Sequence, residues 1–123
     1  MVMEVERRAY WYKQVSKDLN IEIDKEVFDK MFEICESIDY GWGYLIHVAT
    51  PTLFEGRVLY VISWYILPEE RNFAHIKQIQ NDIKRLAKEN KCKYIKQYSH
   101  FNEQFNQLLV KEGYKISEYT KEV

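Results

Sequence analysis

The chain has 123 residues, of which 46% are apolar and 15% aromatic, enough for one compact domain with a hydrophobic core and too apolar for a disordered protein. Its formal net charge of −1 gives no overall attraction to nucleic acid. No apolar run is long enough to span a bilayer, and the first ten residues lack the apolar core of a signal peptide. We therefore expect a cytoplasmic protein with no membrane partner and no nucleic-acid partner.

The cysteines and histidines do not show the spacing of metal ligands. Cys35 and Cys92 are far apart in the sequence, and each has apolar neighbours, which is typical of buried, reduced thiols. The three histidines, His47, His75 and His100, are equally scattered. We therefore expect no metal site.

The spacing of apolar residues predicts two helices in the first part of the chain. A first helix is predicted over residues 2–17, although Tyr10-Trp11-Tyr12 would also suit a strand. Asp24 can cap a second helix, which ends before the Gly41-Trp42-Gly43 break. The residues expected to be buried on this second helix are Phe28, Met31, Phe32 and Cys35.

Two strands should follow these helices. β-branched and aromatic residues predict the first over residues 44–49, interrupted by Pro51-Thr52 and followed by a turn at Glu55-Gly56. The second, Arg57–Leu67, is apolar on both faces, which is typical of a central strand covered by helices. Pro68 ends it.

The rest of the chain predicts a helix, a strand, a helix and a strand. A long amphipathic helix is expected from Arg71 to Glu89, then a strand over 92–98, a helix over 102–112 ended by Gly113, and a final strand from Tyr114. The apolar face of the long helix should comprise Phe73, Ile76, Ile79, Ile83 and Leu86.

This order of elements predicts an α/β fold, or α+β in some classifications. We expect a single domain over residues 1–123, with a mixed central sheet flanked by helices. The strands at 57–67 and 92–98 should be parallel and splayed at their ends, because a strand–helix–strand unit needs a right-handed crossover between parallel strands.

Two patterns in the second half resemble motifs of the GNAT superfamily of N-acetyltransferases. The first, Tyr65-Ile66-Leu67-Pro68-Glu69-Glu70-Arg71, resembles the segment in which a hydrophobic strand ends in V-x-P and runs through an arginine into the phosphate-binding loop. The second begins with Asn102-Glu103-Gln104-Phe105 and ends with Lys111-Glu112-Gly113-Tyr114, and it resembles the C-terminal pattern N-E-x-A-x-x-L-Y-x-K-x-G-F. The order and separation of the two motifs indicate a GNAT-like domain.

The resemblance implies a binding site for acetyl-CoA as co-substrate. In the family the pantetheine arm pairs with the backbone of the strand that ends in the first motif, here Tyr65, Ile66 and Leu67. The pyrophosphate lies on amides at the following helix N-terminus, where the helix dipole favours anions. The residues implied for this phosphate loop are Arg71, Asn72, Phe73, Ala74, His75 and Ile76, and Asn102 of the second motif is also assigned to the cofactor site.

The chain departs from the family pattern at three positions. Ala74 replaces the first glycine of the phosphate loop, and Ile76 replaces its second small residue. The side chain of Ile76 either blocks the pyrophosphate or turns into the core and leaves its N–H free. Leu109 stands where many members have a tyrosine that protonates the leaving thiolate, so the phosphate loop is degenerate and the acid is missing.

Candidate catalytic residues are found by elimination. The strand 57–67 has no carboxylate in its interior. Tyr98 and His100 follow the next strand, and ligands of α/β sheets lie beyond the carboxyl ends of strands. His100 has suitable chemistry for removing a proton from an amine near neutral pH. His75 could pair with a phosphate or face solvent, and His47 is most simply a structural histidine.

Three functions remain open from the sequence. The first is an acyl-CoA-dependent N-acyltransferase that moves the acetyl group of acetyl-CoA to a primary amine of an acceptor. The second is a catalytically inactive GNAT-fold protein that binds a CoA-like ligand or a protein partner. The third is an unrelated small α/β binding domain. Aromatic residues of the first half, such as Tyr10 and Trp42, can line an acceptor pocket or a homodimer contact.

Overall fold

The computed structural model describes residues 3–97, 111, 113 and 114. The helices are α1 (Val5–Leu19), α2 (Lys25–Ile34) and α3 (Phe73–Glu89), with a 3-10 turn, η1 (Pro68–Glu70), before α3. The strands are β1 (Glu36–Asp39), β2 (Gly43–Thr52), β3 (Gly56–Ile66) and β4 (Tyr94–Gln97). The chain therefore begins with two helices, continues through a three-stranded meander, and reaches β4 through α3.

The four strands form one mixed sheet in the order β1-β2-β3-β4. The first two pairings are antiparallel, and β4 pairs with β3 in parallel, from Val58 opposite Tyr94 to Val61 opposite Gln97. The predicted mixed sheet, with α3 crossing between parallel strands, is therefore confirmed. The predicted splaying of β3 and β4 involves Tyr98, which lies outside the described residues, so it stays a prediction.

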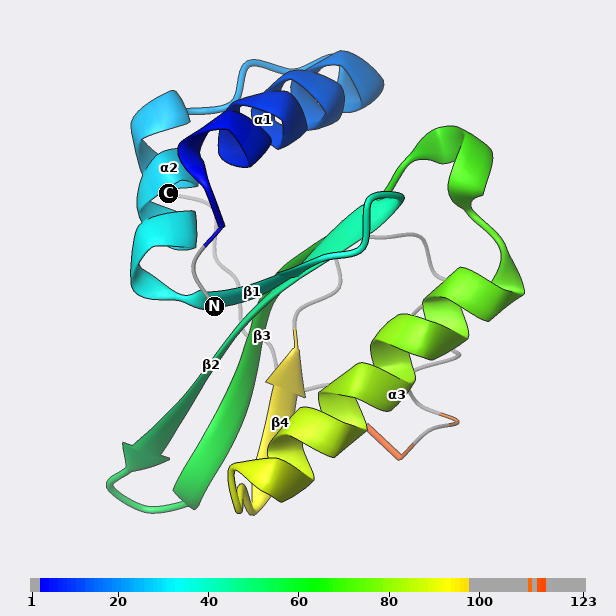
Figure 1. Ribbon diagram of the computed structural model, residues 1–123. Helices are drawn as coiled ribbons and strands as arrows, with labels where there is room; N and C mark the ends of the chain where they lie inside the picture. Colours follow the sequence, from blue (N-terminus) through cyan, green and yellow to red (C-terminus); the bar gives the residue numbers. More distant parts are fainter. Residues whose placement is uncertain (1–2, 98–110, 112, 115–123) are drawn as a thin grey trace, which may run out of the picture.

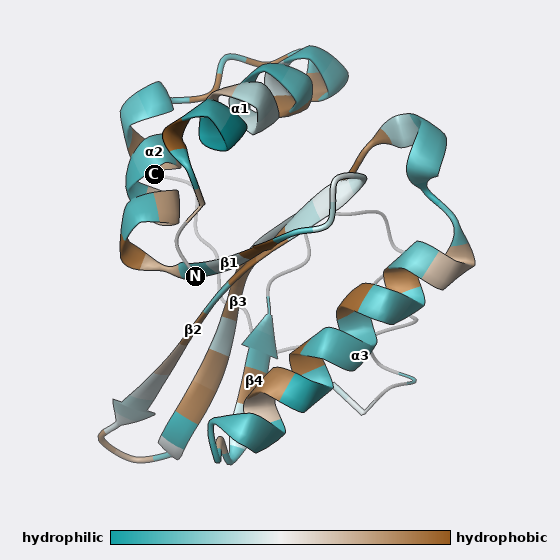
Figure 2. Ribbon diagram, viewed as in Figure 1, coloured by the Kyte–Doolittle hydropathy of each residue, from teal (hydrophilic) through white to brown (hydrophobic). Residues whose placement is uncertain are grey.

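Helices cover both faces of the sheet. Figure 1 shows α1 and α2 on one face and α3 on the other. Along β2 and β3, the side chains of Tyr44 and Tyr65 pack toward α1 and α2, whereas Leu45 and Leu59 pack toward α3. Trp11 of α1 is fully buried and makes an edge contact with Tyr44, with ring centroids 5.4 Å apart. Hydrophobic residues accordingly dominate β2 and β3 in Figure 2, while they alternate with hydrophilic ones along α3.

The first two helices agree with the sequence prediction. Tyr10-Trp11-Tyr12 is helical, as part of α1. Asp24 caps α2, because its side chain accepts the N–H of Val27 at 3.1 Å. Of the residues expected to be buried here, Phe28, Phe32 and Cys35 are buried and Met31 is half-buried.

The strand β1 was not predicted. Its four residues include two acids, Glu36 and Asp39, and only one large apolar side chain, so no hydrophobic pattern marks it. All four residues pair with β2, and the hydrogen bonds of this ladder stabilise a strand whose own β propensity is weak. The strand β2 is longer than predicted and continues through Pro51, which lies opposite Arg57 next to the hairpin turn.

The long helix begins later than predicted, at Phe73 instead of Arg71. Pro68 starts the 3-10 turn, and Asn72 adopts an extended conformation as the N-cap of α3. Phe73 was expected on the apolar face, but it is 73% exposed because it occupies the first turn, beyond the edge of the core. The strand after α3 begins at Tyr94 instead of residue 92, since Asn90 and Lys91 form the turn out of the helix.

Cys35 and Cys92 are both free thiols, and burial raises the pKa of Cys35.

None of the described helices has the length and apolar character needed to cross a membrane. Within residues 3–97 and the three described positions near the C-terminus, no group of side chains is arranged to hold a metal ion.

Candidate functional site

The candidate site lies where β3 ends and the chain turns into α3. Tyr65 and Ile66 are buried, and Leu67 is half-buried. The N–H of Leu67 donates to the carbonyl of Trp42 at 2.9 Å, which continues the β2–β3 pairing one residue beyond the strand. The end of β3 is therefore fixed by its antiparallel neighbour.

Arg71 folds back over this strand end. Its Nε donates to the carbonyl of Ile66 at 3.0 Å, and its Nη2 forms an ion pair with Asp18 of α1. The Tyr65 hydroxyl donates to the same Asp18 oxygen at 3.0 Å, and the guanidinium carbon lies 5.5 Å from the centroid of the Tyr65 ring. Burial, followed by the hydrogen bond to Asp18, raises the pKa of Tyr65. Asp18 was not identified from the sequence, because it lies 53 residues from Arg71.

The first turn of α3 supplies fewer free amides than the sequence implied. The side chain of Asn72 accepts the N–H of His75 at 2.8 Å, and the Asn72 carbonyl accepts the N–H of Ile76 at 3.2 Å. Asn72, Phe73 and Ala74 hold the remaining amides of the implied set, and groups at these helix positions have no intrahelical acceptor. An anion at this helix N-terminus would therefore meet the amides of residues 72–74 first.

The side chain of Ile76 turns into the core. It is half-buried and packs against the cluster formed on the α3 face of the sheet by residues such as Ile79 and Leu45. Of the two alternatives left open by the sequence, the inward orientation is the observed one. The N–H of Ile76 is nevertheless used within the helix.

A stack of three aromatic rings stands beside the loop and was not predicted. The ring of Trp42 lies between those of Tyr40 and His75, at centroid distances of 4.5 Å and 3.9 Å and interplanar angles of 13° and 9°. The Tyr40 hydroxyl donates to Asp82 of α3 at 2.5 Å, and burial raises the pKa of Tyr40. His75 Nδ1 is 2.6 Å from the Glu70 carbonyl. His75 therefore links the β1–β2 turn to the start of α3 through its ring.

Several predicted site residues lie outside the described residues. They are Tyr98, His100, Asn102 and Leu109, together with most of the predicted last helix and the final strand from residue 115. Within that region Lys111 is helical, and Gly113 has a φ of 97°, the left-handed conformation expected of a residue that ends a helix. His47 lies in the middle of β2, is buried, and has a pKa lowered mainly by that burial.

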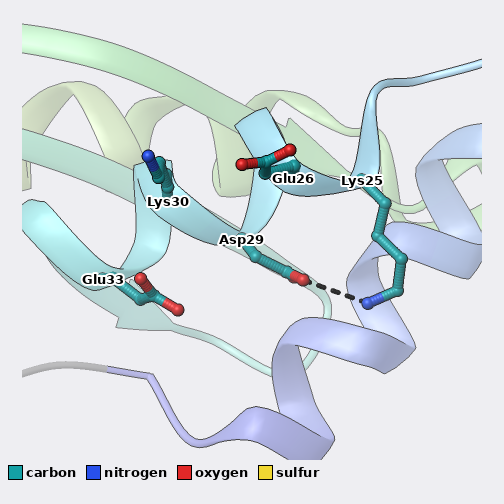
Figure 3. A pocket seen from close by; sticks show the side chains of 5 residues that line it. All are labelled: Lys25, Glu26, Asp29, Lys30 and Glu33. Carbon is teal, nitrogen blue, oxygen red and sulfur yellow. Dashed lines mark hydrogen bonds and ion pairs between the residues drawn. The ribbon is translucent and has the colours of Figure 1, made fainter.

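An open depression lies elsewhere, along α2. Figure 3 shows that all five lining side chains come from this one helix and that Lys25 bridges to Asp29, at 3.0 Å. The other three are Glu26, Lys30 and Glu33. Lys25 pairs with Asp29 within α2, and Glu33 pairs with Arg8 of α1 at 3.2 Å. Such mixed, paired charges are typical of a solvated surface, so we place the candidate site at the end of β3.

Neither a family model nor a curated relative matches this chain. Solved structures do match over nearly its whole length. A ribosomal-protein-alanine N-acetyltransferase from Brucella melitensis biovar Abortus 2308 aligns with a TM-score of 0.68 and 12% identity, over 98% of this chain and 94% of that one. A putative acetyl transferase from Pyrococcus furiosus aligns with a TM-score of 0.66 and 13% identity, over 100% and 97% of the two chains.

An aminoglycoside N-acetyltransferase, AAC(6')-Iy, solved in complex with CoA, aligns with a TM-score of 0.67 and 13% identity, over 98% of this chain and 90% of that one. At these identities the likeness establishes the fold. The chain has the GNAT fold of these acetyltransferases, in agreement with the motifs found in its second half.

Proposed function

We propose that this chain, which has the GNAT fold, is an acyl-CoA-dependent N-acyltransferase that transfers the acetyl group of acetyl-CoA to a primary amine of an acceptor. The observation that carries the proposal is the parallel β3–β4 pair bridged by α3, with Arg71 and the N-terminus of α3 directly after the end of β3. The solved structures named above, which match the fold of this chain, are acetyltransferases, and one of them is a complex with CoA.

The residues at this strand end fit the diphosphate of CoA. Arg71 keeps 44% of its side chain exposed, and the amides of residues 72–74 lie at the helix N-terminus, where the dipole favours an anion. Because Ile76 turns inward, its side chain leaves room outside the loop. We assign the diphosphate to Arg71 and these amides, and the pantetheine arm to the backbone of Tyr65, Ile66 and Leu67. Asn102 stays assigned to the cofactor site.

The chemistry assigned to the protein is mainly positioning. The neutral amine attacks the thioester carbonyl, the C–N bond forms as the C–S bond breaks, and CoA leaves as the thiolate. A strand amide near Ile66 polarises the carbonyl. His100, directly or through a water held with Tyr98, takes the proton that the attacking nitrogen loses. With leucine at position 109, the thiolate leaves without a tyrosine acid, which a weakly basic thiolate permits.

A second candidate is a GNAT-fold protein that binds a CoA-like ligand or a protein partner without acyl transfer. The observation that favours it is the internal pairing of the phosphate loop. Asp18 already pairs with Arg71, and Asn72 already accepts the N–H of His75. Each of these contacts must be exchanged or shared when an anion binds.

An acyl-transfer assay distinguishes the two candidates. The protein is incubated with acetyl-CoA and a panel of primary amines, and free thiol and acetylated amine are quantified from pH 5.5 to 9. The transferase predicts that thiol release depends on an amine, and that His100→Gln lowers the rate and removes a rise centred near pH 6.5. Binding of acetyl-CoA without amine-dependent thiol release would instead support the non-catalytic protein. An unchanged pH profile in His100→Gln would remove His100 from the mechanism.

A further inference from the structure

The network around Asp18 joins α1 to the end of β3. One carboxylate oxygen of Asp18 accepts both the Tyr65 hydroxyl, at 3.0 Å, and Arg71 Nη2. Arg71 is held on its other side by the carbonyl of Ile66, 3.0 Å from Nε. The plane of the guanidinium is thus fixed by two acceptors from different elements, and its direction depends on Asp18.

The two members of the ion pair differ in exposure. The side chain of Asp18 is 19% exposed, and that of Arg71 is 44% exposed. A partly buried pair is screened less by water and salt than a surface pair. Arg71 has five N–H donors, and the two contacts to Ile66 and Asp18 leave others directed to solvent. An anion can therefore reach Arg71 while Asp18 is still bound to it.

Such an anion meets the negative charge of Asp18. The anion can share the guanidinium with the Asp18 carboxylate, and the two negative charges then repel each other. It can instead displace the carboxylate from Arg71, which leaves the Tyr65 hydroxyl as the remaining described partner of Asp18. Both routes weaken the binding of a diphosphate, and neither affects a ligand without phosphates.

We propose that Asp18 is a positioning residue of the cofactor site. It orients Arg71 across the end of β3, and its negative charge weakens the binding of diphosphate ligands there. This inference rests on the proposed function, since it assigns the diphosphate of CoA to Arg71. An ion pair that only stabilises the fold would not discriminate between ligands with and without a diphosphate. The affinity for CoA should depend on the charge of Asp18, while the affinity for pantetheine, which lacks the diphosphate, should not.

Calorimetric titration of the full chain with CoA and with pantetheine tests the proposal. Asp18→Asn keeps the size and the acceptor oxygen of the side chain and removes its charge, so it should bind CoA about tenfold more tightly and pantetheine unchanged. Asp29→Asn is the matched control, because it removes the same charge from the Lys25–Asp29 pair on α2. It should leave both affinities at the parent values.

Arg71→Gln is the third variant to be titrated with CoA and pantetheine. It should weaken CoA binding, and the gain from Asp18→Asn should differ in size between the parent and the Arg71→Gln background, because the two side chains are in contact. CoA binding by the parent with no gain in Asp18→Asn would overturn the role of Asp18 and leave the proposed function intact. An equal gain for pantetheine, or for Asp29→Asn, would overturn it as well. Absence of CoA binding in the parent and in Asp18→Asn would overturn both proposals. A thermal melt of each variant confirms that it is folded.

Discussion

The backbone of Gly43 lies directly against the backbone of Tyr65 across the β2–β3 ladder, and a Cβ atom on Gly43 would be 2.2 Å from the Tyr65 carbonyl oxygen. No side chain fits at this distance without separating the strands. The close approach holds the end of β3, and with it the candidate site, against the β1–β2 turn.

Gly43→Ala should therefore destabilise the fold by about 3 kcal/mol, as expected for overpacking against immovable backbone. Gly41→Ala is the matched control. A Cβ on Gly41 meets nothing within 4 Å, but the φ of +84° makes alanine strained, at about 1 kcal/mol. Urea unfolding of both variants measures the difference. Equal losses of unfolding free energy in the two variants would show that the strands move apart easily at Gly43 and Tyr65.

Asn72→Gly should raise the affinity for CoA several-fold. The substitution removes the oxygen that accepts the N–H of His75, and this amide becomes available to the diphosphate. Glycine at an N-cap costs only a few tenths of a kcal/mol. Asp24→Gly removes the equivalent cap of α2, where Asp24 accepts the N–H of Val27, and should leave CoA affinity unchanged. Titration of both variants with CoA is the measurement, and equal affinities would contradict the assignment of the diphosphate to α3.

Ile76→Gly should destabilise the protein and should not tighten CoA binding. The side chain packs against the core on the α3 face of the sheet, so its loss and the added helix glycine together cost about 3 kcal/mol. Phe73→Ala, one turn earlier and 73% exposed, should stay within about 0.5 kcal/mol of the parent. Urea unfolding and CoA titration check both outcomes. Tighter CoA binding in Ile76→Gly would mean that this side chain obstructs the loop.

The stability of the fold should decrease as the pH falls below about 6.5, because of His47. Burial lowers the pKa of His47, and the opposing effect of Glu36 is weaker. The unfolded chain therefore binds a proton at a pH at which the folded chain does not, so His47 contributes its stability above pH 6.5 and loses it on acidification. Unfolding free energies of the parent and of His47→Gln at pH 7.5, 6 and 5 test this. Parallel curves for the two proteins would rule out His47 as the cause.

The parallel β3–β4 unit could be predicted from the sequence because its signals are local. A strand that is apolar on both faces, followed by an amphipathic helix, has few alternatives to a crossover between parallel strands. The strand β1 could not be predicted, because Glu36 and Asp39 interrupt its pattern and only pairing with β2 forms it.

The contacts that shape the candidate site are long-range. Asp18 meets Arg71, and Trp42 meets His75, only when the sheet brings α1 and the β1–β2 turn to the end of β3. No spacing in the sequence marks such pairs. The sequence therefore indicated a candidate phosphate loop through Arg71, but it did not show that side chains of the same chain already contact part of that segment.

We propose above that the end of β3 and the start of α3 bind acetyl-CoA. Isothermal titration of the full chain with acetyl-CoA tests it most directly. We expect a saturable one-to-one isotherm that an excess of CoA abolishes by competition and that Asn72→Gly shifts to tighter binding. An absence of heat at millimolar acetyl-CoA, in both the parent and Asn72→Gly, would contradict it.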